Sequence, residues 1–203
     1  MIKISLRIIL PLSMILFLCF YAEATPLYLS DYLGVASGSY TTTSYSPYTT
    51  VNQQCYGFGA DRIGSWSSSK ISFQDRGIFN KGIGAHSASS IVFYLNPLRN
   101  IQSFTTFETI VGIDVSGGYG TRFKVYVDAV LVENVVVASV SSASIYLSVD
   151  VTNATTLSLI NEDYGARGGN HSAWADAKLT GSVPEPANFL MALGTILFLL
   201  LKK

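Results

Sequence analysis

The chain has few of the residues on which most enzymes and nucleic-acid-binding proteins depend. Only 13% of its 203 residues are charged, 13 Lys and Arg balance 13 Asp and Glu, and there are two histidines and two cysteines. A formal charge of zero argues against a nucleic-acid partner, because neutralising phosphates requires clustered basic residues. Soluble domains carry about 25% charged residues, so this chain is more hydrophobic than a typical soluble domain. Its hydrophobic residues make up 49% of the sequence, and the excess lies at the two ends.

Catalytic motifs are also missing. No G-x-S-x-G turn is present to hold a nucleophilic serine beside a histidine base. The glycine-rich stretch 117–120 lacks the Lys-Ser/Thr pair and the helix of a phosphate-binding loop. A zinc site would need both histidines and a cysteine, and no pair of these has close spacing. Glu162 and Asp163 are adjacent in sequence, whereas a glycosidase needs two acids across a cleft. The sequence therefore predicts a protein that is not an enzyme.

The N-terminal segment has the layout of a signal peptide. Two basic residues precede an apolar run at 8–20, and Ala22-Glu23-Ala24 supplies the small-x-small site that signal peptidase requires. The run is shorter than the roughly 20 residues of a membrane-spanning helix. We expect cleavage between Ala24 and Thr25, with a retained N-terminal anchor as the alternative. The mature chain would then keep only Cys55, so an intramolecular disulfide is excluded.

The C-terminal segment carries a second apolar signal. Pro184, Glu185 and Pro186 precede an uncharged run at 187–201, and two lysines end the chain. As a helix the run is about 22 Å long, short of a hydrocarbon core of about 30 Å. The layout resembles the PEP-CTERM sorting signal of certain Gram-negative bacteria. The resemblance implies contact with the membrane through a transmembrane helix and processing by an exosortase-type enzyme, and a plain C-terminal anchor is the alternative.

The middle of the chain, residues 25–183, predicts one all-β domain. Apolar and polar residues alternate with period two in the segments that we expect to form half-buried strands: 122–128 and 145–152. Short apolar runs at 91–95 and 135–137 and the Thr- and Phe-rich stretch 101–114 indicate further strands. Turn-forming residues separate these segments, at Asn96-Pro97 among other places. Many short strands with polar turns are typical of a β-sandwich or jelly roll.

Residues 33–60 are rich in Ser, Thr and Tyr and predict a long loop. Its tyrosines Tyr40, Tyr45 and Tyr48 are suited to stacking on a sugar, because each combines an apolar ring with a polar edge. The alternative is that these rings pack on the sandwich.

Two motifs carry a family resemblance: Lys81–Ser89, which reads KGIGAHSAS, and Asn170–Leu179, which reads NHSAWADAKL. They resemble the NPCBM domain, a carbohydrate-binding module associated with glycosyl hydrolase family 98. Shorter matches support the resemblance at 28–31, 61–62 and 113–114. It implies a galactose-binding-like jelly-roll sandwich that binds glycans without hydrolysing them.

The resemblance singles out six candidate carbohydrate-binding residues: His86, His171, Trp174 and Asp176, with Asp114 and Arg62 as weaker candidates. Three of the first four also have a structural interpretation. Trp174 is suited to stacking on a sugar ring or to packing under a loop. Asp176 is suited to a sugar hydroxyl or Ca²⁺, or to pairing with Arg62 or Lys178. His86 is suited to a sugar hydroxyl or to a buried hydrogen bond.

The sequence departs from the family at Asn170 and Ala173, where acidic residues are usual. The sequence indicates no certain cofactor, and a structural Ca²⁺ is the one candidate. The leading hypothesis is an exported, non-catalytic module at the bacterial cell envelope whose partner is a glycan or exopolysaccharide. The alternative is a structural envelope protein of the same fold that acts through protein–protein contacts. A partly exposed aromatic side chain with polar neighbours at one end of the sandwich would favour the first.

Overall fold

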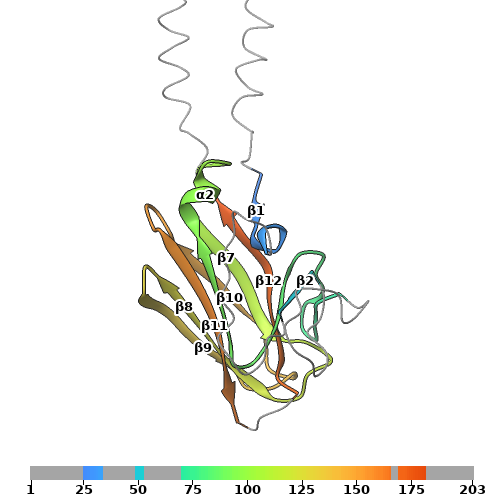
Figure 1. Cartoon of the computed structure of the whole chain (residues 1–203). Coiled ribbons are helices and arrows are strands. Elements are labelled where there is room, and N and C mark those ends of the chain that lie inside the picture. The colour runs from blue at the N-terminus through green and yellow to red at the C-terminus, as the bar shows by residue number, and fades with distance from the viewer. Residues whose placement is uncertain (1–24, 34–48, 53–69, 166–168, 182–203) are drawn as a thin grey trace, which may run out of the picture. The chain divides into compact units, whose positions relative to one another are not determined.

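The computed structural model describes residues 25–33, 49–52, 70–165 and 169–181 (Figure 1). In these residues antiparallel strands form a large sheet, a small sheet and a two-stranded hairpin. The large sheet has the order β10 (Ile145–Asp150), β7 (Thr106–Ile113), β12 (His171–Thr180), β5 (Gly82–His86) and β2 (Thr49–Val51), and β1 (Leu27–Tyr28) pairs with the end of β12. The small sheet has the order β6 (Ser89–Tyr94), β11 (Thr156–Tyr164), β8 (Gly120–Val127) and β9 (Val130–Val137).

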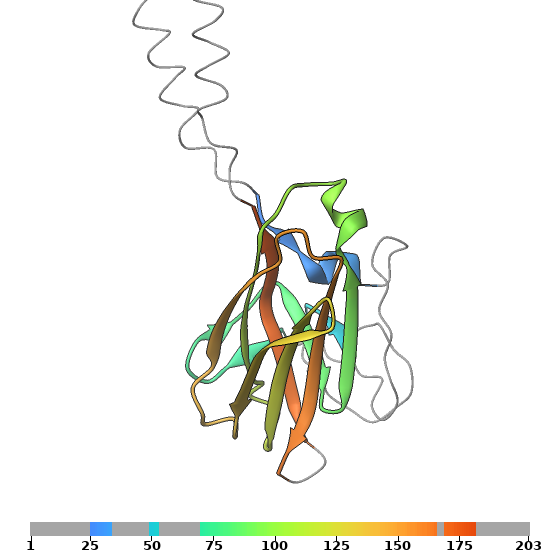
Figure 2. The same cartoon turned by 90° about the vertical axis from the view of Figure 1, so that its left-hand side faces the viewer.

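The core fills the space between these two sheets, which face each other in the view of Figure 2. Alternate residues of each strand point into it, such as Phe123 and Val125 of β8 and Phe107 and Val111 of β7, all fully buried. This arrangement confirms the all-β sandwich and the strands expected at 122–128 and 145–152, because period-two alternation places one side of each strand in the core.

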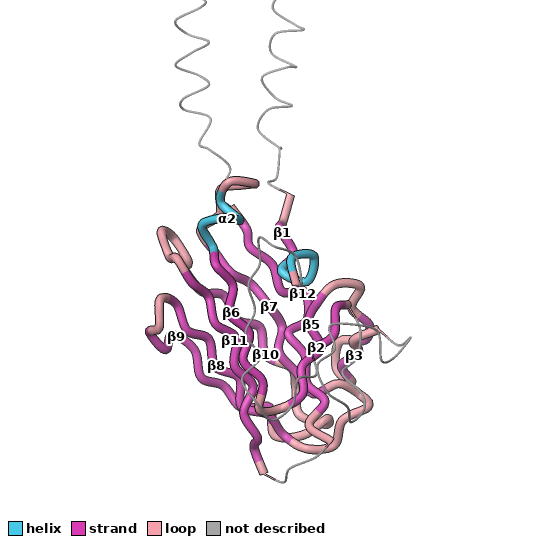
Figure 3. Tube along the Cα trace, viewed as in Figure 1, coloured by secondary structure: helices cyan, strands magenta, loops and turns pink. Residues whose placement is uncertain are grey.

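Helical structure in the described residues is confined to the 3-10 turn η1 (Leu29–Tyr32) and the short helix α2 (Leu95–Arg99), shown in Figure 3. The helix α2 corrects the turn predicted at Asn96-Pro97. Pro97 lies in the first turn of α2, where its missing N–H has no intrahelical partner to lose. Strand β2 likewise lies inside the range 33–60 that the sequence assigns to a loop.

A short hairpin, residues 71–79, covers the outer face of the large sheet; we call it the covering hairpin. It contains β3 (Ser72–Phe73) and β4 (Gly77–Ile78). Ile71 and Phe73 pack on Ala173 and Ala175 of β12. Small residues are needed on this face because the hairpin lies directly against the sheet: a Cβ added to Gly112 would lie 2.9 Å from ring atoms of Phe73.

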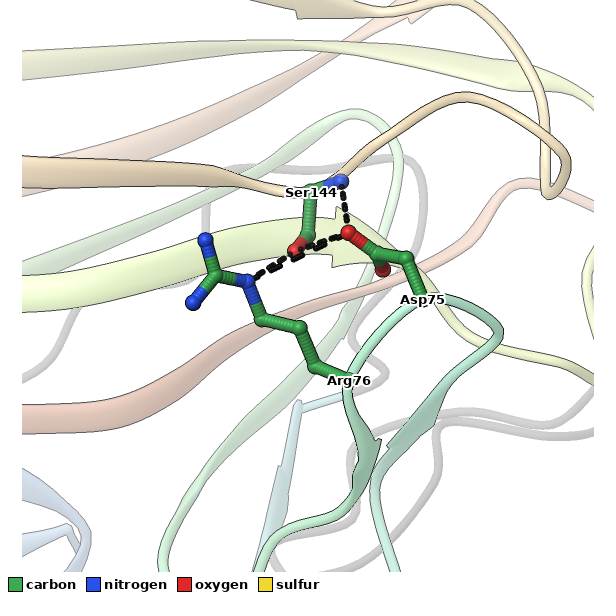
Figure 4. A network of polar contacts seen from close by, with 3 residues as sticks. All are labelled: Asp75, Arg76 and Ser144. Carbon is green, nitrogen blue, oxygen red and sulfur yellow. Dashed lines mark hydrogen bonds and ion pairs between the residues drawn. The ribbon is translucent and has the colours of Figure 1, made fainter.

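Polar contacts fasten the turn of the covering hairpin to the segment before β10 (Figure 4). Asp75 accepts hydrogen bonds from the backbone N–H and the hydroxyl of Ser144, both at 2.9 Å, and Arg76 Nε donates to Ser144 Oγ at 2.8 Å. Partial burial raises the pKa of Asp75, but the hydrogen bonds from Ser144 and the Arg76 charge outweigh it. The pKa of Asp75 therefore lies below its usual value.

Candidate functional site

Three parts of the chain meet at one end of the sandwich, which we call the loop end: the turn between β5 and β6, the loop between β7 and β8, and the described residues between β11 and β12, which are 165 and 169–170 (lower end in Figure 1). The loop end lies opposite the end where β1 pairs with the last residues of β12. It contains parts of both family motifs, because β5 ends at His86 and β12 begins at His171. These two histidines are direct partners in the antiparallel register.

The histidine pair lies on the outer face of the large sheet. The ring centroids of His86 and His171 are 5.6 Å apart, with the ring planes inclined at 58°. Nδ1 of His171 lies 3.0 Å from the carbonyl oxygen of Ser116, and Nδ1 of His86 lies 3.1 Å from that of Ser87. Desolvation and the neighbouring His86 lower the pKa of His171, so this ring is neutral at pH 7 and able to accept a hydrogen bond.

Asp114 holds the β7–β8 loop together from inside. It is fully buried, and its carboxylate accepts hydrogen bonds from the backbone N–H of Ser72 at 2.9 Å and from the N–H and hydroxyl of Ser116 at 2.9 and 2.8 Å. Its own N–H donates to the carbonyl oxygen of His171 at 2.8 Å. The structure thus brings Asp114 beside the histidine pair but gives it a structural set of partners.

Trp174 is a core residue, which corrects its interpretation as a sugar-stacking side chain. It is completely buried, its ring meets that of Phe123 edge-on with centroids 5.2 Å apart, and its Nε1–H donates to Asn161 Oδ1 at 2.6 Å. An indole enclosed in this way has no face to offer a ligand.

Asp176 lies away from the histidine pair. It is at a β-bulge, between Ala175 and Lys178 in the register with β7, and its φ is +52°. The bulge breaks the alternation that the sequence implies for this strand, so Ala177 joins Trp174 in the core. Asp176 accepts a hydrogen bond from Lys178 Nζ at 2.9 Å, which matches the structural interpretation. Arg62 lies outside the described residues.

The loop end also contains functional candidates that the sequence reasoning missed. Tyr119 is the last residue of the β7–β8 loop and stands between two glycines. It is 49% exposed, and its ring lies against Gly169, 3.6 Å from a Cβ built there. The Gly-Tyr-Gly pattern was a usable signal, because an aromatic residue in a turn often lies at the surface. Tyr164, at the end of β11, is 42% exposed, and the guanidinium of Arg122 lies 5.9 Å from its ring centroid.

Asp163 is a third residue of the loop end whose role the sequence reasoning missed. Its Oδ1 accepts hydrogen bonds from the Ser87 hydroxyl and from Asn170 Nδ2, the latter at 3.1 Å. This pairing gives a reason for asparagine at position 170, where the family usually has an acid. An aspartate there would place a second negative charge against Asp163, whereas the amide donates to it.

Polar side chains continue from the loop end into the space between the sheets. Asn161 Nδ2 donates to Ser172 Oγ at 2.8 Å, and Ser172 Oγ donates to the carbonyl oxygen of Ala85 at 2.6 Å. Buried oxygens of Ser89, Thr121 and Asn170 have no hydrogen-bond partner in the part of the chain that the structure describes. The interior is therefore polar at this end.

The other expectations concern a metal ion and the membrane. Within the described ranges, no group of three or more His, Cys, Asp or Glu side chains is placed to hold a metal ion. No helix in those ranges is both long and apolar enough to span a membrane. The expected signal peptide, cleavage site, sorting motif and helix 187–201 lie almost wholly outside the described residues.

The two packed antiparallel sheets place the chain in the class of all-β sandwich domains, and comparison with known proteins specifies the family. The profile of the NPCBM/NEW2 domain matches residues 34–180. The chain belongs to this family. No curated protein matches the chain.

Solved structures of CBM51 modules have the same fold. The structure of CBM51 from Clostridium perfringens GH95 in complex with methyl-galactose is 27% identical with a TM-score of 0.60, covering 77% of this chain and 100% of that one. The structure of CBM51-2 in complex with GlcNAc and INT domains from Clostridium perfringens ZmpB is 27% identical with a TM-score of 0.58, covering 78% and 32%.

A larger structure shares the module as one part of several. The M60 catalytic domain with the CBM51-1 and CBM51-2 domains from Clostridium perfringens ZmpB is 28% identical with a TM-score of 0.59, and the match covers 78% of this chain. The match spans only 15% of the length of that chain. The chain described here thus has the fold of carbohydrate-binding modules, which are non-catalytic, although some related modules are attached to catalytic domains.

Proposed function

We propose that this protein is a non-catalytic carbohydrate-binding module that binds a glycan at the loop end of its sandwich. The observation that supports this most directly is the meeting of both family motifs in the pair of His86 and His171. The half-exposed Tyr119 lies two residues from Gly117, whose added Cβ would lie 2.9 Å from the carbonyl oxygen of His171. The loop end thus combines an exposed aromatic ring with imidazole groups.

The chemistry of this end suits a pyranose. A sugar presents an apolar C–H face, which an exposed tyrosine ring can cover, and hydroxyl groups that both donate and accept hydrogen bonds. A single shallow site of this kind binds weakly, with a dissociation constant in the range of about micromolar to millimolar, or about −4 to −8 kcal/mol.

The proposal includes export to the bacterial cell envelope. It is supported by the sequence of the two ends: the small-x-small site before Thr25, and Pro184, Glu185 and Pro186 before the apolar run 187–201. The module would then act on glycan at or outside the envelope, either held there by its C-terminus or released after processing by an exosortase-type enzyme.

A titration of the purified chain with methyl-galactoside and with GlcNAc, followed by a glycan array, tests the binding. The decisive variant is Tyr119→Ala, and the matched control is Tyr94→Ala. Tyr94 is 48% exposed against 49% for Tyr119, but it lies at the far end of β6 from the loop end. We expect Tyr119→Ala to weaken binding by about tenfold or more, equivalent to about 1.4 kcal/mol, with little change in thermal stability. Tyr94→Ala should bind as the wild type does.

Two results would contradict the proposal. Equal losses of sugar affinity in Tyr119→Ala and Tyr94→Ala would show that binding does not take place at the loop end. A folded wild-type chain that binds no sugar on the array would favour the alternative function, a structural envelope protein that works through protein–protein contacts.

A further inference from the structure

Two buried oxygen atoms near the loop end have no hydrogen-bond partner among the residues that the structure describes. They are Thr121 Oγ1, at the start of β8, and Asn170 Oδ1, just before β12. Both residues are completely buried. An unpaired polar atom shielded from water is costly, so native proteins pair nearly all of them with protein groups or with ordered water. Two such atoms in one region therefore point to a bound molecule.

Strand register and hydrogen bonds place these two residues around the same carboxylate. Thr121 is the direct partner of Asp163 in the pairing of β8 with β11, and its side chain points between the sheets like that of the core residue Phe123, two positions further along. Asn170 Nδ2 donates to Asp163 Oδ1 and to the carbonyl oxygen of Gly120, both at 3.1 Å. That carbonyl belongs to the peptide group that joins Gly120 to Thr121.

We propose that one ordered water molecule, bound between the two sheets, joins the hydroxyl of Thr121 to the side-chain oxygen of Asn170. This water site is a property of the free protein and does not depend on the proposed function.

The hydrogen-bonding capacity of these groups fits water. Asn170 Nδ2 donates to two groups that accept, the carboxylate of Asp163 and the carbonyl of Gly120. These acceptors fix the orientation of the amide and leave Oδ1 as an acceptor that needs a donor. A water molecule accepts a hydrogen bond from the Thr121 hydroxyl and donates one to Asn170 Oδ1, and the Asp163 carboxylate is an acceptor for its second hydrogen. Three protein partners is the usual number for a buried water.

The water connects the start of β8 to the segment before β12. The backbone already joins these two parts of the chain, because the N–H of Gly118 donates to the carbonyl oxygen of Gly169 at 2.9 Å. Tyr119 lies between Gly118 and Gly120, and both of these neighbours are therefore hydrogen-bonded to residues 169–170. The water adds a contact between the same two segments on their inner side.

A high-resolution crystal structure of the purified chain tests the site without any ligand. We expect a single peak of electron density at hydrogen-bond distance, about 2.5–3.0 Å, from both Thr121 Oγ1 and Asn170 Oδ1. A peak about 2.3–2.6 Å from six or more oxygen atoms would identify a calcium ion instead and would overturn the proposal.

The variant Thr121→Val gives a second test, in which the sign of the effect depends on the water. Valine has nearly the same shape as threonine but lacks the hydroxyl. If the hydroxyl donates to a bound water, its loss should lower the equilibrium constant for folding by a factor of about five. If the hydroxyl has no partner, its loss should raise that constant, because a buried unpaired group is removed. Urea unfolding measures the difference.

The matched control is Thr109→Val. Thr109 is a buried threonine of β7 whose hydroxyl donates to the carbonyl oxygen of Ala175 at 2.9 Å. It shows the loss of stability expected when a threonine hydroxyl with a fixed acceptor is removed, and Thr121→Val should lose stability to a similar extent.

Three results would overturn the proposal: a crystal structure with no density between the two oxygens, a direct hydrogen bond between Thr121 and Asn170, and a higher folding constant in Thr121→Val than in the wild type. A chain that shows the water but binds no sugar would refute the proposed function and leave this inference standing.

Discussion

Replacement of Trp174 separates a core tryptophan from a sugar-binding one. Removing a buried Trp side chain as in Trp174→Ala costs about 3–5 kcal/mol, and it leaves Asn161 Oδ1 without the donor that now lies at 2.6 Å. An unpaired buried acceptor adds about 1–3 kcal/mol. Domains are stable by only about 5–15 kcal/mol, so the Ala variant is expected to be largely unfolded or close to it.

Trp174→Phe is the more informative change, because it keeps an aromatic ring against Phe123 and removes the N–H. We expect a loss of about 1–3 kcal/mol from the unpaired oxygen of Asn161, plus a smaller loss from the reduced ring volume. Urea unfolding measures this loss of stability. An unchanged slope of the unfolding free energy against urea concentration would show that the unfolded state is the same. The melting temperature should fall by about 2–4 °C for each kcal/mol in a chain of this length.

A double-mutant cycle with Asn161→Leu tests the cause. Asn161→Leu alone leaves the indole N–H of Trp174 unpaired, while Ser172 keeps its bond to the carbonyl oxygen of Ala85. Trp174→Phe with Asn161→Leu removes both polar groups and should cost less than the sum of the single changes, by about 0.5–3 kcal/mol. Additive losses would show that the hydrogen bond between Trp174 and Asn161 is not the source of the lost stability. A Trp174→Phe variant with wild-type stability and no glycan binding would refute the assignment of this residue to the core.

Three further predictions concern other parts of the chain. Gly112→Ala should destabilise the domain by about 1–3 kcal/mol in urea unfolding, because its Cβ would lie 2.9 Å from the ring of Phe73, whereas Gly118→Ala, with no heavy atom within 4 Å of its Cβ, should not. The pKa of His171 is lowered in the folded state, so its contribution to stability is complete above about pH 6.5 and should decline as the pH falls toward the folded pKa; a pH series of unfolding curves for wild type and His171→Gln would show it. N-terminal sequencing of the exported protein should begin at Thr25, and an intact Met1 would contradict the predicted cleavage.

The sequence allowed the fold to be predicted because burial acts on alternate residues. The segments 122–128 and 145–152 each place one side in the core, and their alternation is visible without any knowledge of the partner strand. The helix α2 could not be predicted in this way, since five residues are too few to show a helical period. Strand β2 was also missed, because its pairing with β5 depends on tertiary contacts and its Thr-rich sequence fits a loop equally well.

The candidate site was predicted only in part, for a reason that lies in β12. Its motif serves three purposes along one strand: His171 lies on the outer face at the loop end, Trp174 lies in the core, and Asp176 lies at the bulge. A strict alternation puts Trp174 and Asp176 on the same side, and the bulge that separates them arises from the extra residue in the pairing with β7. Nothing in the motif itself shows where the register shifts.

The residues that the sequence reasoning missed have one property in common. Their roles depend on contacts with residues that are distant in the sequence. Asp163 matters because two side chains reach it from other parts of the chain: Asn170 from just before β12, and Ser87 from the β5–β6 turn. Tyr119 matters because Gly169 lets its ring lie against the chain before β12. The family motifs identify the strands that build the loop end, whereas the side chains best placed to meet a sugar come from the loops between them. Differences in ligand between members of this fold should therefore be sought first in the β7–β8 loop, where a changed residue at position 119 alters the surface without disturbing the core.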